Sequence, residues 1–259
     1  MFPDKINELI IVACHAAFKG NITLPIKNPA GDGQWVLFPF QQGEPKYYLE
    51  HMKHGIELLK RNENSILMFS GGHTRKDSGN WTEASSYLQA GLFYNLWADD
   101  ASSENSLANR IILEEYARDS FENLLFSICK FYEVTDIFPG KITLISWDFK
   151  KTRFILHCES IGYSVNNFSF SSVNNPEDIE TAVKGEKDAV NNFKTNLYGS
   201  AGNLLKKRNE RNPFNKTIPY YNLDLLNNFF IFINDPVNRK CKYQYNLPWH
   251  FEKINTDTK

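Results

Sequence analysis

The chain has 259 residues, of which 42% are hydrophobic and 14% aromatic, so it can form one large domain with a sizeable core. Its formal net charge of -1 excludes a general electrostatic attraction to nucleic acid or to an anionic membrane surface. Any anion that the protein binds must therefore meet a local cluster of basic side chains.

The sequence also bears on the compartment in which the protein works. Residues 1–11 carry Asp4 and Glu8 and lack the apolar stretch of a signal peptide, and no run reaches the roughly 18 apolar residues of a membrane span. Four cysteines occur without CxxC spacing, namely Cys14, Cys129, Cys158 and Cys241. The first three lie in apolar surroundings, which is typical of reduced, buried thiols. We expect a soluble, cytoplasmic protein without a membrane span.

Short apolar runs alternate with segments of helical spacing. The runs are Leu9–Ala13, Ile66–Phe69, Ile111–Leu113 and Ile142–Ile145, with a weaker one at Asn167–Phe170. The helical segments are Tyr47–Lys60, Trp81–Leu96, Asp119–Tyr132 and Lys151–Ile161. Buried parallel strands have continuous apolar runs and need crossover helices. The order predicts an α/β fold, a three-layer sandwich with a mostly parallel sheet of about five strands. A strand order of 3-2-1-4-5 would place the first run centrally.

Two further segments divide the chain. Residues 18–45 are long and punctuated by glycine and proline, which predicts a flap over the core. Beyond Pro176 the pattern becomes mainly helical, and it includes a basic stretch at 206–211. We therefore expect an α/β core over residues 1–175 and a helical C-terminal extension over 176–259 that packs on the core.

Four motifs follow the predicted strands in a recognisable order. They are Ser70-Gly71-Gly72, Thr82-Glu83-Ala84, Glu114-x-x-Ala117-x-x-Ser120-x-x-Asn123 and Ser146-x-Asp148-Phe149-x-x-x-Arg153. Together they resemble the motifs of the YdcF/SanA/ElyC-like family (domain of unknown function 218), over roughly residues 9–170. The resemblance implies a Rossmann-like fold, and bacterial members of that family are linked to cell-envelope polysaccharide metabolism or to S-adenosylmethionine binding.

The chain departs from this family in two places. Lys150 stands where the family usually has histidine, so a fixed cation replaces an acid/base group that titrates near neutral pH. The segment after Pro176 falls outside the bacterial pattern and resembles eukaryotic, chiefly fungal, members with a longer C-terminus.

The first motif predicts an anion-binding loop. Gly71 and Gly72 let backbone N–H groups approach a phosphate or carboxylate, and Ser70 and His73 add side chains beside them. Arg75 follows and adds positive charge. The alternative is a plain strand-to-loop turn.

Two residues are candidates for proton transfer. Glu83 begins a predicted helix behind Thr82 and serves either as a carboxylate at the ligand or as a part of the cap. His15, which follows Cys14, is either a base or a hydrogen-bonded structural residue. Cys14 itself is a weaker alternative, as a nucleophile.

The remaining candidates follow the third and fourth strands. Glu114 ends a strand, where a carboxylate can accept hydrogen bonds from ribose hydroxyls. Ser120 and Asn123 would cap the next helix, whose first N–H groups would face an anion. Asp148 is a candidate catalytic acid or base. Lys150 and Arg153 would hold a phosphate, unless the two cations only form a salt bridge with Asp148.

Metal ligands are less well indicated. His51 and His54 have helical spacing but no partner that would complete a zinc site, so we predict no resident metal. Glu83, Glu114 and Asp148 would together hold magnesium if the substrate brought phosphates.

Two functions remain open. In the first, the protein is an enzyme, a hydrolase or transferase, acting on an anionic, phosphate-bearing or nucleotide-like small molecule, with Glu83, His15 and Asp148 as catalytic residues. In the second, it is a non-catalytic binding protein for S-adenosylmethionine or a nucleotide. The sequence indicates no oligomeric state.

Overall fold

The computed structural model describes residues 5–19, 30–97 and 106–250. Its centre is a five-stranded sheet whose neighbouring strands are all parallel. In chain order the strands are β1 (Glu8–Ala13), β4 (Ser65–Ser70), β5 (Ile111–Glu114), β6 (Lys141–Ser146) and β7 (Phe168–Ser172). Their spatial order is β5-β4-β1-β6-β7, which corresponds to 3-2-1-4-5 among the parallel strands. The predicted parallel α/β sheet is confirmed, and β1 lies at its centre.

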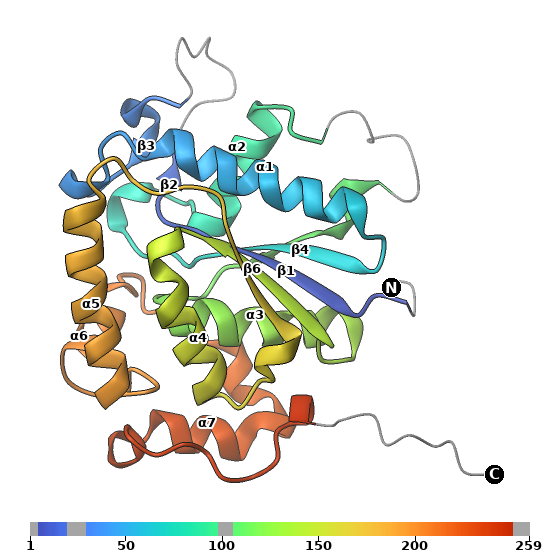
Figure 1. Ribbon diagram of the computed structural model, residues 1–259, viewed down its shortest axis with the longest axis vertical. Coiled ribbons are helices and arrows are strands. Elements are labelled where there is room, and N and C mark those ends of the chain that lie inside the picture. The colour runs from blue at the N-terminus through green and yellow to red at the C-terminus, as the bar shows by residue number, and fades with distance from the viewer. Residues whose placement is uncertain (1–4, 20–29, 98–105, 251–259) are drawn as a thin grey trace.

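Helices cover both faces of the sheet (Figure 1), because successive side chains of each strand point in opposite directions. Ile10 and Val12 of β1 pack with α1 (Pro45–Arg61) and α2 (Glu83–Phe93). Leu9 and Ile11 pack on the other side with α3 (Ser120–Thr135) and α4 (Lys151–Ser160). Residues 9–13 of the central strand are thus all apolar because both faces of the strand are buried there, which explains the continuous apolar run.

The predicted flap is described in part. Strand β2 (Ala17–Phe18) pairs antiparallel with β3 (Trp35–Val36), and residues 20–29 between them lie outside the described residues. The side-chain amide of Gln41, just beyond β3, donates to the backbone oxygen of His15 at 2.8 Å. This bond holds the second half of the predicted flap against the end of β1.

The C-terminal segment packs on the core, as expected. It contains α5 (Ile179–Thr195), α6 (Gly202–Glu210) and α7 (Asn227–Asn234). Phe193, Tyr198 and Phe229 belong to the same buried cluster as the face of the sheet that α3 and α4 cover. Figure 1 shows α5 and α6 beside the sheet and α7 beyond α4. The extension therefore shares one hydrophobic core with the sheet.

Short 3-10 turns connect these elements. They are η1 (Asp32–Gln34), η2 (Pro39–Gln41), η3 (Lys76–Ser78), η5 (Leu107–Arg110), η6 (Asp148–Lys150), η7 (Val165–Asn167), η8 (Pro219–Asn222), η9 (Asp224–Leu226), η10 (Pro236–Asn238) and η11 (Pro248–His250). None of the helices in the described ranges is long and apolar enough to cross a membrane.

Candidate functional site

A cavity of about 740 Å³ opens at the carboxyl ends of β1 and β6. The chain runs outward from β1 through β4 to β5 and then returns to β6 on the other side of β1, so this edge is the topological switch point of the sheet. Open α/β sheets bind ligands there, and the volume lies within the usual range for small-molecule sites. The lining comes from the loops after β1 and β6, from η2, from the starts of α2 and α3, and from α5.

His15 and Lys150 meet in the middle of this cavity. The amine of Lys150 donates to Nδ1 of His15 at 3.3 Å, which places the ring proton of a neutral His15 on Nε2, 3.5 Å from the Ser146 hydroxyl. Burial, followed by the charge of Lys150, lowers the pKa of His15 well below its ordinary value. Because His15 is neutral and both of its ring nitrogens are engaged, it orients Lys150 better than it could serve as a base.

Lys150 faces the cavity and, like Arg211, has no ion-pair partner among the described residues. Burial, followed by the charge of Arg153, lowers its pKa to about 7. This corrects the expectation of a fixed cation at the position where the family usually has histidine. The amine exchanges its proton near neutral pH, as an imidazole would.

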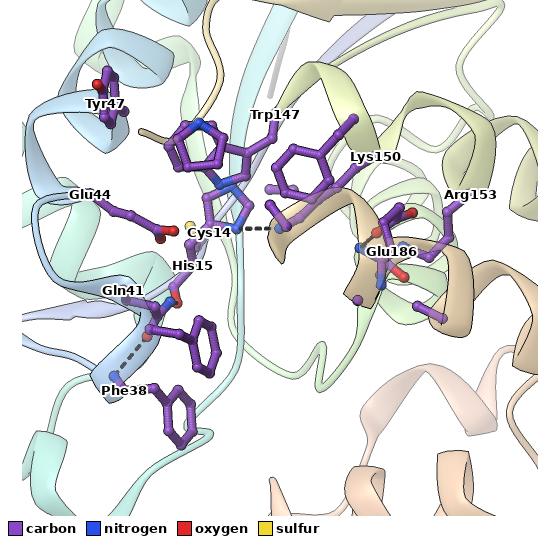
Figure 2. Close-up of a pocket in the computed structure, with 18 of the residues that line it drawn as sticks. Cys14, His15, Phe38, Gln41, Glu44, Tyr47, Trp147, Lys150, Arg153 and Glu186 are labelled. Atoms are coloured by element: carbon purple, nitrogen blue, oxygen red, sulfur yellow. Dashed lines mark hydrogen bonds and ion pairs between the residues drawn. The ribbon is translucent and has the colours of Figure 1, made fainter. Parts of the chain in front are cut away.

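Arg153 lies deeper in the same wall and pairs with α5. Its Nη2 is 2.9 Å from a carboxylate oxygen of Glu186. Its Nε and the other oxygen of Glu186 are buried with no hydrogen-bond partner among the described residues. A buried donor without a partner is costly, so Arg153 has a spare donor for a ligand. Figure 2 shows both residues on the Lys150 side of the cavity.

Glu83 borders the cavity at the first turn of α2. Thr82 caps this helix by accepting from the backbone N–H of Ser85, as the sequence predicts, so the Glu83 side chain is not needed for capping. The hydroxyl of Thr74 donates to Oε1 of Glu83. Burial raises the pKa of Glu83, and the hydrogen bond from Thr74 opposes that shift. A half-buried carboxyl with a raised pKa at a cavity is a candidate for proton transfer.

The start of α3 also borders the cavity, but Asp119 rather than Ser120 or Asn123 caps it. The Asp119 carboxylate accepts from the backbone N–H of Glu122. Ser120 instead shares a 2.8 Å hydrogen bond with Nε2 of His157. Asn123 donates its amide hydrogens to Ser70, which leaves its side-chain oxygen toward the cavity without a partner among the described residues.

The predicted anion-binding loop is a close-packed turn. The backbone N–H of Gly71 donates to the backbone carbonyl oxygen of Glu114 at 3.0 Å, and that of Gly72 donates to the backbone carbonyl oxygen of Ala117 at 2.7 Å. A Cβ atom on Gly72 would lie 2.7 Å from that same Ala117 oxygen. The glycines are therefore required for close backbone approach, and their N–H groups are not available to an anion.

Glu114 is a structural carboxyl, fully buried and outside the cavity lining. It accepts from Ser70, from the backbone N–H groups of Tyr116 and Ala117, and from the hydroxyl of Tyr220. Burial raises its pKa to about 7 although these donors favour the charged form. The expectation that Glu114 meets a ribose fails because the chain folds back over it.

Ser70, His73 and Asp148 also lie outside the cavity lining. Ser70 is buried between Glu114 and Asn123, and the His73 ring packs on Phe214 with centroids 4.0 Å apart. Asp148 is exposed because the chain turns into η6 directly after Trp147. Within the described ranges, no three His, Cys, Asp or Glu side chains converge as metal ligands. Glu83, Glu114 and Asp148 therefore do not come together as the magnesium site that the sequence suggests.

The basic stretch at 206–211 divides between two roles. Arg208 is buried, with ion pairs of 2.7 Å to Asp119 and 3.2 Å to Glu122, so it neutralises acidic groups at the start of α3. Arg211 borders the cavity and donates to the backbone oxygen of Arg118 at 3.0 Å. Of this stretch, Arg211 reaches the cavity lining, whereas Lys206 and Lys207 are exposed to solvent.

Several carboxylates of the cavity lining already have partners. Glu177 pairs with Lys46 at 2.6 Å, and Asp178 caps α5. Glu44 accepts from the hydroxyl of Tyr48. Asp119 and Glu186 are also paired with arginines, whereas Glu83, Glu44 and Asp178 have no cationic partner among the described residues.

Aromatic rings line the cavity on the flap side and on the loop after β6. Phe38, Phe40 and Tyr47 come from the flap and the start of α1, and Trp147 and Phe149 come from the loop after β6. The Trp147 ring stacks against His15, with centroids 5.9 Å apart. The cavity therefore has a charged end and an aromatic end, with His15 between them (Figure 2).

Sequence reasoning missed the contribution of α5 and η2. Glu186, Gly185 and Thr181 line the cavity although they follow β7, beyond the resembling motifs. The capping residue Asp178 indicates where this helix begins in the sequence, but it does not indicate that the helix runs along the cavity. The aromatic pair Phe38 and Phe40, within a segment otherwise typical of a polar turn, is the signal that would have found the flap side.

The remaining histidines and Cys14 carry no metal or nucleophile chemistry here. His51 bonds Asn174 and His54 bonds Ser171. Cys14 borders the cavity, but burial raises the pKa of its thiol well above the ordinary value, which disfavours the thiolate.

These features define an α/β protein with a small-molecule cavity at the switch point of a five-stranded parallel sheet. The chain is 32% identical over 266 residues to the uncharacterized protein YOR238W of Saccharomyces cerevisiae, and the alignment covers 84% of this chain and 87% of the yeast protein. It belongs to the family of that yeast protein. No family model matches the chain, and no solved structure matches it.

Proposed function

We propose that the protein is an enzyme, a hydrolase or transferase, that acts on a phosphate-bearing small molecule in the switch-point cavity. The observation that carries this proposal is the presence of two half-buried cations on one wall of the cavity. Lys150 has no carboxylate at ion-pair distance among the described residues, and Arg153 has an Nε donor without a partner. Groups of this kind bind phosphate by charge and by directed hydrogen bonds.

The first turn of α3 completes the anion site. Ser120 and Asn123 border the cavity, and the positive end of the helix dipole lies at this turn. Glu83 faces the same space and transfers a proton to or from the reacting group. Asp148, by contrast, has no place in this mechanism because it is exposed and outside the lining.

Membership of the YdcF/SanA/ElyC-like family and a cytoplasmic location are parts of the same proposal. The parallel sheet agrees with the Rossmann-like fold that the resemblance implies. Cys14, Cys129 and Cys158 are buried free thiols, which supports a reducing compartment.

A second candidate is a non-catalytic binding protein for S-adenosylmethionine. One observation favours it: Glu186 has a buried oxygen without a partner beside Lys150 and Arg153. Carboxylate and cations on one wall would suit the ammonium and carboxylate groups of an amino-acid moiety.

A thermal-shift panel with the full chain tests both proposals. The ligands are inorganic phosphate, sugar phosphates, polyprenyl phosphate analogues, nucleotides and S-adenosylmethionine, each with and without magnesium. A ligand at a hundred times its Kd should stabilise the protein by about 2.7 kcal/mol. Each stabilising phosphate compound is then incubated with the protein and followed by ³¹P NMR for turnover.

The outcome depends on a matched pair of variants. Lys150→Met should abolish stabilisation by phosphorylated ligands, whereas Lys151→Met, at the exposed neighbouring position, should retain it. Stabilisation by S-adenosylmethionine alone would reject the phosphate-enzyme proposal in favour of the second candidate. No stabilisation by any ligand would reject both.

A further inference from the structure

The aromatic end of the cavity holds two phenylalanine rings that are open to solvent. Phe38 is 39% exposed and Phe40 is 73% exposed, and both border the cavity. Their rings are parallel within 4°, with centroids 5.5 Å apart. Exposing such large apolar side chains is unfavourable, and grouped exposed apolar side chains mark binding sites. The pair offers ring faces that a flat ligand can cover.

The surroundings of this pair are polar. The guanidinium carbon of Arg75 lies 4.3 Å from the centre of the Phe38 ring, which fixes that ring by a cation–π contact. Gln42 is exposed, and its amide has no partner among the described residues, while Glu44 presents a carboxylate at the same rim. An alkyl chain would offer these groups no hydrogen-bond partner. A heteroaromatic ring can stack on the phenylalanines and exchange hydrogen bonds with Gln42 and Glu44 at its edge.

Gln41 connects the two ends of the cavity, because its side chain accepts from the backbone N–H of Phe38 at 2.9 Å and donates to the backbone oxygen of His15 at 2.8 Å. Tyr47 contacts Trp147 with ring centroids 5.4 Å apart, and Trp147 stacks on His15. His15 in turn accepts from Lys150. Figure 2 shows Phe38 and Glu44 on one side of the cavity and Arg153 on the other. A ligand that occupies the whole site therefore has a flat ring at one end and an anion at the other.

We propose that the Phe38–Phe40 pair is the base subsite of a nucleotide whose phosphate lies at Lys150 and Arg153. This inference rests on the proposed function, because it takes the phosphate end from that proposal and adds the class of substrate. Selectivity for a nucleotide over a sugar phosphate then comes from stacking at the flap.

The experiment compares ligands that share a phosphate and differ in the base. Isothermal titration of the full chain is carried out with adenosine 5′-monophosphate, uridine 5′-monophosphate and ribose 5-phosphate. We expect at least one nucleotide to bind about tenfold or more tightly than ribose 5-phosphate, which corresponds to about 1.4 kcal/mol. Phe40→Ala should remove most of that difference and leave the affinity for ribose 5-phosphate unchanged.

Two further variants make the test specific for the ring. Phe40→Leu keeps apolar bulk but lacks the aromatic face, so it should also lose most of the nucleotide preference. Tyr245→Ala removes an aromatic side chain of similar exposure, 72%, outside the cavity lining, and should behave as wild type. Because Phe40 is exposed, its substitution leaves the core intact.

Several outcomes would overturn the inference. Equal binding of nucleotides and ribose 5-phosphate would reject the base subsite while the phosphate site stands. A Phe40→Leu variant that keeps the full nucleotide preference would show apolar contact instead of stacking and would reject it also. If none of the three phosphates binds, this inference fails, and the proposed function fails with it where the wider thermal-shift panel also shows no stabilisation.

Discussion

The amine of Lys150 lies 3.3 Å from Nδ1 of His15, and this contact joins the end of β6 to the end of β1 across the switch point of the sheet. Other buried cations of the described chain, such as Arg153 and Arg208, have carboxylate partners. Lys150 has a neutral imidazole instead. Its charge is therefore set by pH and by what enters the cavity.

This relationship predicts that anion binding weakens above neutral pH. The pKa of Lys150 is lowered to about 7, so a bound anion holds the protonated amine and raises its pKa again. Phosphate monoesters lose their second proton near pH 6, and their charge is constant above pH 7.5. The affinity for a phosphorylated ligand, measured by titration calorimetry from pH 7.5 to 9.5, should fall several-fold, because the free amine has lost its proton in this range and must take one up on binding.

Arginine at the same position provides the control. Lys150→Arg keeps its charge over this range, so its affinity should not change with pH. A wild-type affinity that stays constant from pH 7.5 to 9.5 would contradict a titrating amine at the anion site.

Glu83→Gln should separate binding from turnover. The amide keeps the shape of the carboxyl and its hydrogen bond with Thr74, but it cannot transfer a proton. Turnover should fall about 100-fold or more, while Kd for the same ligand changes less than threefold. ³¹P NMR and calorimetry on one protein sample measure the two quantities. A proportional loss of both would remove Glu83 from proton transfer.

Glu114 should make the free energy of unfolding depend on pH. Its pKa of about 7 in the folded protein lies above its ordinary value of 4.5, so the fold favours the protonated form. Its contribution to stability is therefore complete below pH 4.5 and is lost as pH rises through about 7. Relative to Glu114→Gln, which stays neutral, wild type should lose on the order of 3 kcal/mol between pH 4.5 and 8 in urea unfolding.

The same position also tests the hydrogen-bond network. Glu114→Ala leaves two backbone N–H groups, those of Tyr116 and Ala117, without their acceptor and should cost about 3 kcal/mol. Exposed Asp148→Ala should change stability by less than about 0.5 kcal/mol. A neutral effect of Glu114→Ala would show that the loop after β5 does not depend on this carboxyl.

Gly72→Ala should destabilise the protein by about 1–3 kcal/mol, because the added methyl group would lie 2.7 Å from a backbone oxygen that cannot move away easily. Gly33→Ala, where a methyl group meets nothing within 4 Å, is the matched control. Chemical denaturation of both variants measures the difference. An equal free energy of unfolding for the two variants would mean that the loop after β4 can shift to accommodate the methyl group without loss of stability.

The sheet could be predicted from the sequence because strands buried on both faces must be apolar throughout. Leu9–Ala13 and Ile142–Ile145 lie within β1 and β6, and the turn residues around them mark the boundaries. Asn167–Phe170 was the weakest run because β7 is an edge strand, with alternating polar residues that remain partly exposed. For the strands of the core, the apolar runs of the sequence therefore match the burial of the strands in the structure.

The site could be predicted only where a residue follows a strand directly. Lys150 and Arg153 reach the cavity as expected, whereas Glu114 and Gly72 are turned into the packing of their own loops. Which of these happens depends on hydrogen bonds between segments distant in sequence. The lowered pKa of Lys150 has the same origin, because it requires burial that only the folded chain creates.

The pairing of Arg153 with Glu186 makes the C-terminal extension a wall of the cavity. A molecule that bridges these two side chains binds only while α5 is docked, so it adds its binding free energy to that docking. Ligand binding at the site and protection of α5 from hydrogen exchange are therefore coupled, because the same free energy stabilises the bound ligand and the docked helix. A protein from which residues after 178 have been cut away would lose the cavity itself, even if its sheet remained folded.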